Sequence, residues 1–101
     1  QQAWKKRSER LVADWVRAQR AGVALDSPEV RRLVDRHVAW LGEIPGTPTH
    51  TGDRKRSSAM IRGLARMYVQ DPAMRHAFGG RVGAEFVRDA LLMHIEEEQE
   101  G

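Results

Sequence analysis

Apolar residues recur at three- and four-residue steps through most of this 101-residue chain, which is the spacing of one face of an α-helix. The pattern predicts helices at about residues 3–21, 53–70, 72–78 and 82–98, and another whose apolar stripe runs from Val30 to Leu41. No segment alternates apolar and polar residues over a useful strand length, so an all-α fold is expected. Helices of such unequal length favour a crossed, globin-like arrangement over an even four-helix bundle.

Capping residues and prolines separate the predicted helices. Asp26-Ser27-Pro28-Glu29 combines capping side chains, an early proline and a first-turn glutamate, which is typical of a helix start. Asp71 precedes Pro72 in the same way, directly after the preceding helix. By contrast, Pro45-Gly46-Thr47-Pro48 is expected to break regular structure.

Composition limits the classes of protein that the chain can represent. With 41% hydrophobic and 31% charged residues, one soluble globular domain over residues 1–101 is expected. No apolar run approaches the roughly 20 residues that span a bilayer. The sequence contains no cysteine, which excludes disulfides and thiolate chemistry and favours a cytoplasmic setting. The tail Glu96–Gly101 is expected to fray, because acidic side chains oppose the helix dipole at a C-terminus.

The formal net charge of +3 leaves two interpretations of the basic residues open. A basic balance suggests anionic partners, whereas a solvated arginine-rich surface is the simpler interpretation. Lys5, Lys6, Arg54 and Arg56 would carry binding of nucleic acid in the first case. A third hypothesis is a dimerisation module whose apolar stripes pair with a second copy.

One apolar stripe bears on function most directly. Met60, Leu64, Met67 and Tyr68 share a face of the helix predicted at 53–70. Such a stripe is either part of the core or the wall of a pocket for a flat, apolar ligand. His37 presents the same alternative within the stripe of its own helix. It is either a hydrogen-bonded core histidine or a polar group that orients a ligand.

The sequence shows no arrangement typical of catalysis. It has no visible nucleophile–base pair, no phosphate-binding glycine loop and no pair of histidines at a metal-ligand spacing. We therefore expect no enzymatic activity, no metal and no cofactor.

Two sequence blocks carry a family resemblance: Gly63-Leu64-Ala65-Arg66-Met67-Tyr68-Val69-Gln70-Asp71-Pro72 and Ala84-Glu85-Phe86-Val87-Arg88-Asp89-Ala90. Together with Leu33–Leu41, where a histidine precedes an apolar pair, they resemble the TipAS antibiotic-recognition domain. The similarity extends from about Leu11 to Leu91. It implies a compact, globin-like bundle of about five helices around a cleft that binds bulky antibiotics.

The resemblance also implies how the ligand is held. Members that trap thiopeptides covalently use a cysteine where this chain has Gly63, so non-covalent binding is expected. Leucine and the aromatic residues would supply buried area, the methionines would adapt to an irregular ligand, and His37 and Tyr68 would be polar anchors. The expected ligand-binding residues are Trp15, His37, Trp40, Leu41, Met60, Leu64, Met67, Tyr68 and Phe86.

The expected partners follow from the same family. They are a small-molecule antibiotic, thiopeptide-like or another multi-ring compound, and a fused or lost N-terminal DNA-binding domain. Family members often form the effector half of MerR-type transcription activators, and others confer drug resistance alone by sequestration. The loop Gly42–Gly52 is longer than in the family, so it is either a lid or a tolerated insertion.

Overall fold

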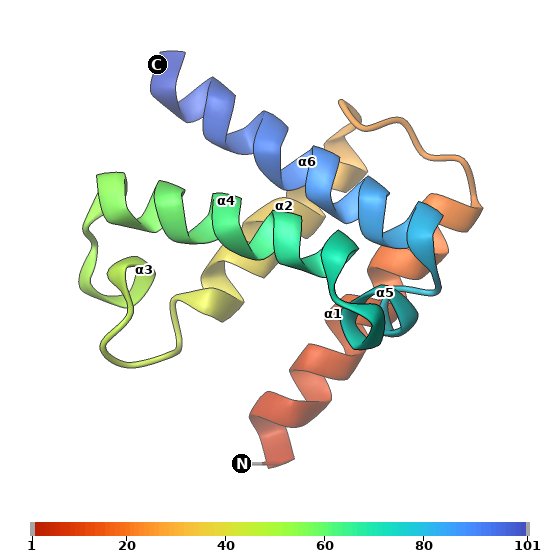
Figure 1. Cartoon of the computed structure of the whole chain (residues 1–101), viewed down its shortest axis with the longest axis horizontal. Coiled ribbons are helices and arrows are strands. Elements are labelled where there is room, and N and C mark those ends of the chain that lie inside the picture. The colour runs from red at the N-terminus through yellow and green to blue at the C-terminus, as the bar shows by residue number, and fades with distance from the viewer. Residues whose placement is uncertain (1, 101) are drawn as a thin grey trace.

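Six α-helices make up the computed structural model, which describes residues 2–100 and their side chains as far as Glu98 (Figure 1). No strand occurs among these residues, so the predicted all-α fold class is confirmed. Within the same range, no helix has both the length and the hydropathy needed to cross a bilayer. The helices are α1 (Gln2–Arg20), α2 (Pro28–Leu41), α3 (Pro48–Thr51), α4 (Arg54–Gln70), α5 (Pro72–Ala77) and α6 (Arg81–Glu100).

Local capping determines where the middle helices begin. In each case a side-chain oxygen accepts a hydrogen bond from a backbone N–H that has no partner inside the helix. Proline occupies the first turn of α2, α3 and α5, where its missing N–H costs nothing. The capping bonds run from Val30 N to Ser27 Oγ (3.2 Å), from Arg56 N to Asp53 Oδ1 (3.1 Å) and from Met74 N to Asp71 Oδ2 (3.0 Å).

Helix α3 adds one turn to the five helices expected from the sequence. The Thr47 hydroxyl accepts from the backbone N–H of His50 at 3.3 Å, and Pro48 follows as the first helical residue. Gly52 ends the turn at φ +83°, a left-handed conformation that favours glycine. The Thr-Pro pair therefore starts a short helix within the loop at 42–52.

Helices α4 and α6 run antiparallel, and α2 crosses behind them (Figure 1). Helix α1 packs against α2 and α6, and its N-terminal half, which ends at the bottom of the view, still contacts the last turn of α2 through Trp4 and Ser8. Helix α6 continues to Glu100, beyond the expected end at residue 98. Fraying of the tail Glu96–Gly101 remains a prediction, and Gly101 lies outside the described residues.

The core runs through the interior faces of all the long helices. On α4 the buried face differs from the predicted stripe of Met60, Leu64, Met67 and Tyr68, because it is rotated about the helix axis. Tyr68 belongs to both faces, while Met60 and Leu64 are half-buried at the edge of the core and Met67 is 38% exposed. The buried residues of α4 are Ile61, Ala65, Tyr68 and Val69.

A close backbone approach fixes α5 against the start of α6. A Cβ atom on Gly83 would lie 1.9 Å from the carbonyl oxygen of Phe78, the residue that caps α5. Only glycine fits at this distance. The short helix α5 is thereby held at a defined place beside α1 and the end of α4.

Candidate functional site

A hydrogen-bonded chain of three side chains crosses the centre of the molecule. Trp15 of α1 donates its indole N–H to Nδ1 of His37 in α2 at 3.1 Å. Nε2 of His37 lies 3.0 Å from the hydroxyl oxygen of Tyr68 in α4. All three residues are buried, and His37 is only 1% exposed. This central triad therefore ties three helices together.

The chemistry of the triad fixes the protonation of His37. Because an indole N–H can only donate, Nδ1 must be the acceptor, and the proton of the neutral ring lies on Nε2. Burial lowers the pKa of His37 to about 4, so the ring is neutral near pH 7. Burial also raises the pKa of the Tyr68 phenol to about 12.

Within the triad, His37 and Tyr68 differ in how many further hydrogen bonds they can make. Both nitrogens of His37 are engaged, which is the geometry of the hydrogen-bonded core histidine. Tyr68 accepts from His37, so its own hydroxyl hydrogen is not used in that bond. Because Tyr68 is only 3% exposed, a ligand could bond either Tyr68 or His37 only after the side chains that cover them move aside.

Aromatic contacts extend the triad in two directions. Trp40 meets His37 edge-on, with ring centroids 5.5 Å apart, and stacks on Trp4 of α1 at 5.0 Å. On the other side, Tyr68 packs on Phe78, with centroids 5.0 Å apart. We call Trp4, Trp40, His37, Tyr68 and Phe78 the aromatic chain. It runs from the start of α1 to the end of α5.

An apolar groove lies between α1 and α5, and we call it the α1–α5 groove. It is an open hollow on the surface, with a volume of about 580 Å³. The aromatic chain adjoins the groove without lining it. Ser8 accepts the Trp40 indole N–H at 2.8 Å, and Phe78, which is 2% exposed, lies between two lining residues in the sequence. The lining residues are Ser8, Glu9, Val12, Ala13, Val16, Ala77 and Gly79.

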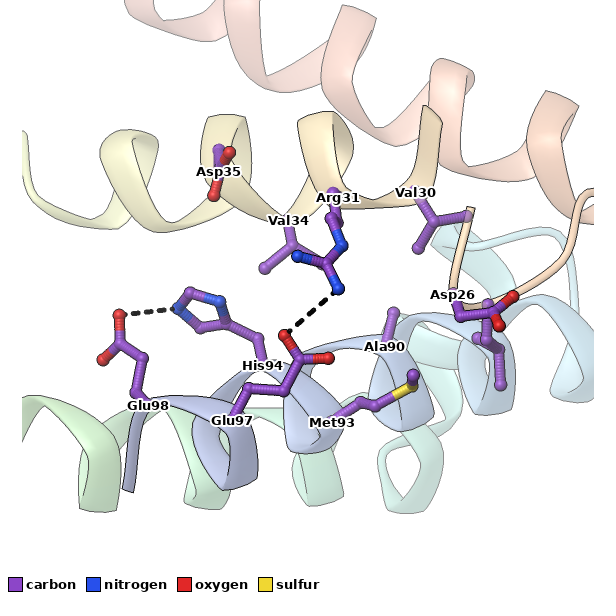
Figure 2. Close-up of a pocket in the computed structure, with 11 residues that line it drawn as sticks. Asp26, Val30, Arg31, Val34, Asp35, Ala90, Met93, His94, Glu97 and Glu98 are labelled. Carbon is purple, nitrogen blue, oxygen red and sulfur yellow. Dashed lines mark ion pairs between the residues drawn. The ribbon is translucent and has the colours of Figure 1, made fainter. Parts of the chain in front are cut away.

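A second hollow, between α2 and α6, has a different character (Figure 2). Its volume is about 290 Å³, and charged side chains extend across it. Arg31 reaches from α2 to Glu97 at 3.6 Å, and His94 lies 3.2 Å from Glu98. These ion pairs occupy the space above an apolar floor, so this hollow suits an apolar ligand less well than the α1–α5 groove.

The nine residues predicted from sequence occupy three environments. The structure brings Trp15, His37, Trp40 and Tyr68 together in the triad and the aromatic chain, and Phe86 lies edge-on to Trp15 at 6.1 Å between centroids. None of the nine lines the α1–α5 groove itself. The buried residues are Trp15, His37, Leu41 and Tyr68, and the half-buried ones are Trp40, Met60, Leu64 and Phe86. Met67 is exposed.

The residues that do line the groove were missed by sequence reasoning. Val12 and Val16 fall beside the stripe of α1 that contains Leu11 and Trp15, and they widen its apolar face. The apolar face of α1 is wider than it needs to be to pack against a single neighbouring helix. That excess width is the sequence signal that could have identified Val12 and Val16. Ala77 and Gly79 carry no comparable signal, because small residues near a turn are common.

The residues of the nucleic-acid hypothesis do not form one surface. Lys5 and Lys6 are exposed near the start of α1, and Arg54 and Arg56 near the start of α4. Figure 1 shows these two helix starts at separate edges of the molecule. Arg56 also pairs with its own capping residue, Asp53, at 3.7 Å.

An all-α bundle with an open apolar groove offers a surface that a ligand-recognition domain can use. The family comparison defines the class. The model of the TipAS antibiotic-recognition domain matches residues 1–94, so the chain belongs to this family. Comparison with curated proteins and with solved structures gives no significant match.

Proposed function

We propose that this protein binds a bulky, largely apolar antibiotic or a similar small molecule, non-covalently, in the α1–α5 groove. The observation that carries the proposal is the groove itself, an open hollow of about 580 Å³ with mostly apolar walls between α1 and α5. Each Å² of apolar ligand surface removed from water contributes about 25 cal/mol. Binding through apolar area also agrees with membership of an antibiotic-recognition family.

The partly exposed side chains of α4, which do not line the groove, are a second set of ligand contacts in our proposal. Met60, Leu64 and Met67 lie at the edge of the core, where unbranched methionines adapt to an irregular ligand. The Tyr68 hydroxyl is the polar anchor of the proposal, and because Tyr68 is 3% exposed and does not line the groove, a ligand must move the covering side chains to reach it. Trp15 and His37 act behind it by holding the phenol in position, and Leu41 and Phe86 support the same core.

Non-covalent capture is part of the proposal. The chain has no cysteine, and the family resemblance implies that members which trap thiopeptides carry one at the position of Gly63. Two biological roles fit reversible capture: drug-responsive control of transcription through a fused DNA-binding domain, and resistance by sequestration. The second role requires only this domain in excess over the drug.

A thermal-shift screen against antibiotics of several classes, multi-ring peptides among them, tests the proposal. A ligand at a hundred times its Kd contributes about 2.7 kcal/mol, which raises Tm by roughly 10 °C in a domain of this size. Tryptophan fluorescence should change with the same compound. If no compound stabilises the protein, the proposed function is wrong.

Replacing either of two alanines by glutamine tests where the ligand binds. Ala13→Gln places a polar side chain in the groove, while Ala59→Gln makes the same change at an exposed position of α4. We expect the first variant to lose about tenfold or more in affinity and the second to bind as the parent does. Equal affinities would place the ligand elsewhere on the molecule.

Salt dependence separates drug capture from binding of nucleic acid. Capture of an apolar ligand should change little between about 50 and 200 mM salt. Phosphate contacts would instead weaken binding steeply over the same range. Affinity that fell steeply with salt would favour the basic residues of α1 and α4 as the functional ones.

A further inference from the structure

A third hollow lies between α1 and α2, on the side of α1 away from the α1–α5 groove. Arg7 lines this hollow and Val16 lines the groove. The two residues are nine positions apart along the helix, about two and a half turns, which places their side chains on opposite sides of α1. The hollow has a volume of about 330 Å³.

Its floor is apolar and its rim is cationic. Leu11, Ala39 and Trp40 provide the apolar surface. Trp40 is fixed there, because one face of its ring is stacked on Trp4 and its N–H is bonded to Ser8. An aromatic ligand would therefore meet a surface that is already ordered, which reduces the entropic cost of binding.

Three arginines surround this floor, and two of them already have carboxylate partners. Arg7 pairs with Glu43 across the hollow. Arg36 donates from Nη1 to Asp14 at 2.9 Å. The third, Arg10, is exposed and has no ion-pair partner among the described side chains of residues 2–98. The rim therefore carries one guanidinium group that lacks an anion.

We propose that this hollow binds a planar aromatic carboxylate of one or two fused rings, with the ring against Leu11 and Trp40 and the carboxylate on Arg10. A guanidinium matches a carboxylate through two parallel N–H···O bonds. The volume is near the lower end of the range for small-molecule sites, which limits the ligand to this size. The site is separate from the α1–α5 groove and does not depend on the function proposed for it.

Nuclear magnetic resonance of the whole chain tests this assignment, with 2-naphthoate as the probe. The indole N–H of Trp40 should shift to saturation, while that of Trp15, buried against His37, should move little. The uncharged analogue 2-naphthamide should bind about fivefold more weakly, because it lacks the charge that pairs with Arg10. Equal binding of the two probes would overturn the proposal.

Two charge-removing substitutions on one helix provide the matched comparison. Arg10→Gln should weaken 2-naphthoate binding about fivefold, and Lys6→Gln, at an exposed position outside the hollow, should change it less than about twofold. Equal losses would indicate general attraction to a basic chain and would overturn the proposal. So would naphthoate-dependent shifts confined to Val16 and Ala77, which would instead assign the probe to the groove.

A second copy of the chain is the alternative occupant, because Glu96–Glu98 on α6 is acidic and exposed. In that case the Trp40 resonance would shift with protein concentration in the absence of any probe. The proposal requires that it does not. Failure of the naphthoate experiment leaves the thermal-shift test of the groove unaffected, so the two proposals can be judged separately.

Discussion

The centre of the molecule and the groove beside it use their side chains in opposite ways. In the centre, Trp15, His37 and Tyr68 are at most 3% exposed and bond to one another. In the α1–α5 groove, Val12 and Val16 are half-buried and line an open hollow. The centre therefore sets how the helices pack, and the groove leaves apolar surface available to a ligand. Substitutions in the centre should cost stability, whereas those at the ligand surface should cost affinity.

The sharpest test of the centre is His37→Ala. The change opens a cavity in the core and leaves the Trp15 indole N–H and the Tyr68 hydroxyl without their shared partner. We expect a loss of about 4 kcal/mol in the free energy of unfolding, measured with urea. His76→Ala is the control, because His76 is exposed on α5 and should change stability by less than about 0.5 kcal/mol. Similar losses in both variants would contradict the central role of the triad.

Gly83 lies at a tightly packed helix junction, whereas Gly63 lies on an open surface, so the same substitution should have opposite effects at the two positions. Gly83→Ala would bring a methyl group within 1.9 Å of the Phe78 carbonyl and displace α5, which forms one wall of the groove. We expect a loss of about 3 kcal/mol. Gly63→Ala has no atom within 4 Å of the new Cβ, so it should stabilise α4 by about 0.5–1 kcal/mol. Thermal unfolding of both variants measures the contrast, and a loss of stability in Gly63→Ala would be the contrary result.

Acid tests the centre without a substitution. Burial lowers the pKa of His37 from 6.5 to about 4, so the unfolded chain takes up a proton at a pH where the folded chain does not. The stability from this residue is complete above pH 6.5 and is lost as the pH falls from 6.5 to 4, in total by about 3 kcal/mol. Urea unfolding at pH 7, 5.5 and 4 measures the loss, which also contains contributions from other groups.

The variant His37→Gln isolates the part that belongs to this histidine. Glutamine has no proton to gain in this range, so the variant should show a shallower pH dependence between pH 6.5 and 4. Parallel curves for the two proteins would show that His37 titrates normally and is not enclosed as described.

Helix starts could be predicted from the sequence because capping is local. Ser27, Asp53 and Asp71 bond to N–H groups three residues ahead, within one window of the sequence. The short turn α3 was not anticipated, since its Thr47-Pro48 start follows directly on Pro45-Gly46, a pair that usually marks a turn.

The partners within the site could not be predicted in the same way. Trp15 and His37 are 22 residues apart, and His37 and Tyr68 are 31 apart. Periodicity indicates which residues share a helix face, but it does not indicate which faces meet. The sequence therefore indicated which of these residues lie on apolar helix faces, and their role in ligand binding stays a prediction. The groove depends on the gap left between α1 and α5, and local sequence does not encode that gap.

Met67→Ala, the variant with the smallest expected effect on stability, tests whether the packed centre includes the exposed part of the α4 stripe. Met67 is 38% exposed on the same stripe of α4 as buried Tyr68, so Met67→Ala should change the free energy of unfolding by less than about 0.5 kcal/mol. The same variant should bind an antibiotic found in the thermal-shift screen about tenfold more weakly, if the methionine covers the ligand as proposed. Val82→Ala, at a 64% exposed position on α6, should alter neither property. A Met67→Ala variant that loses stability but keeps its affinity would assign the whole stripe to the core, and the distinction between centre and ligand surface would then fail on α4.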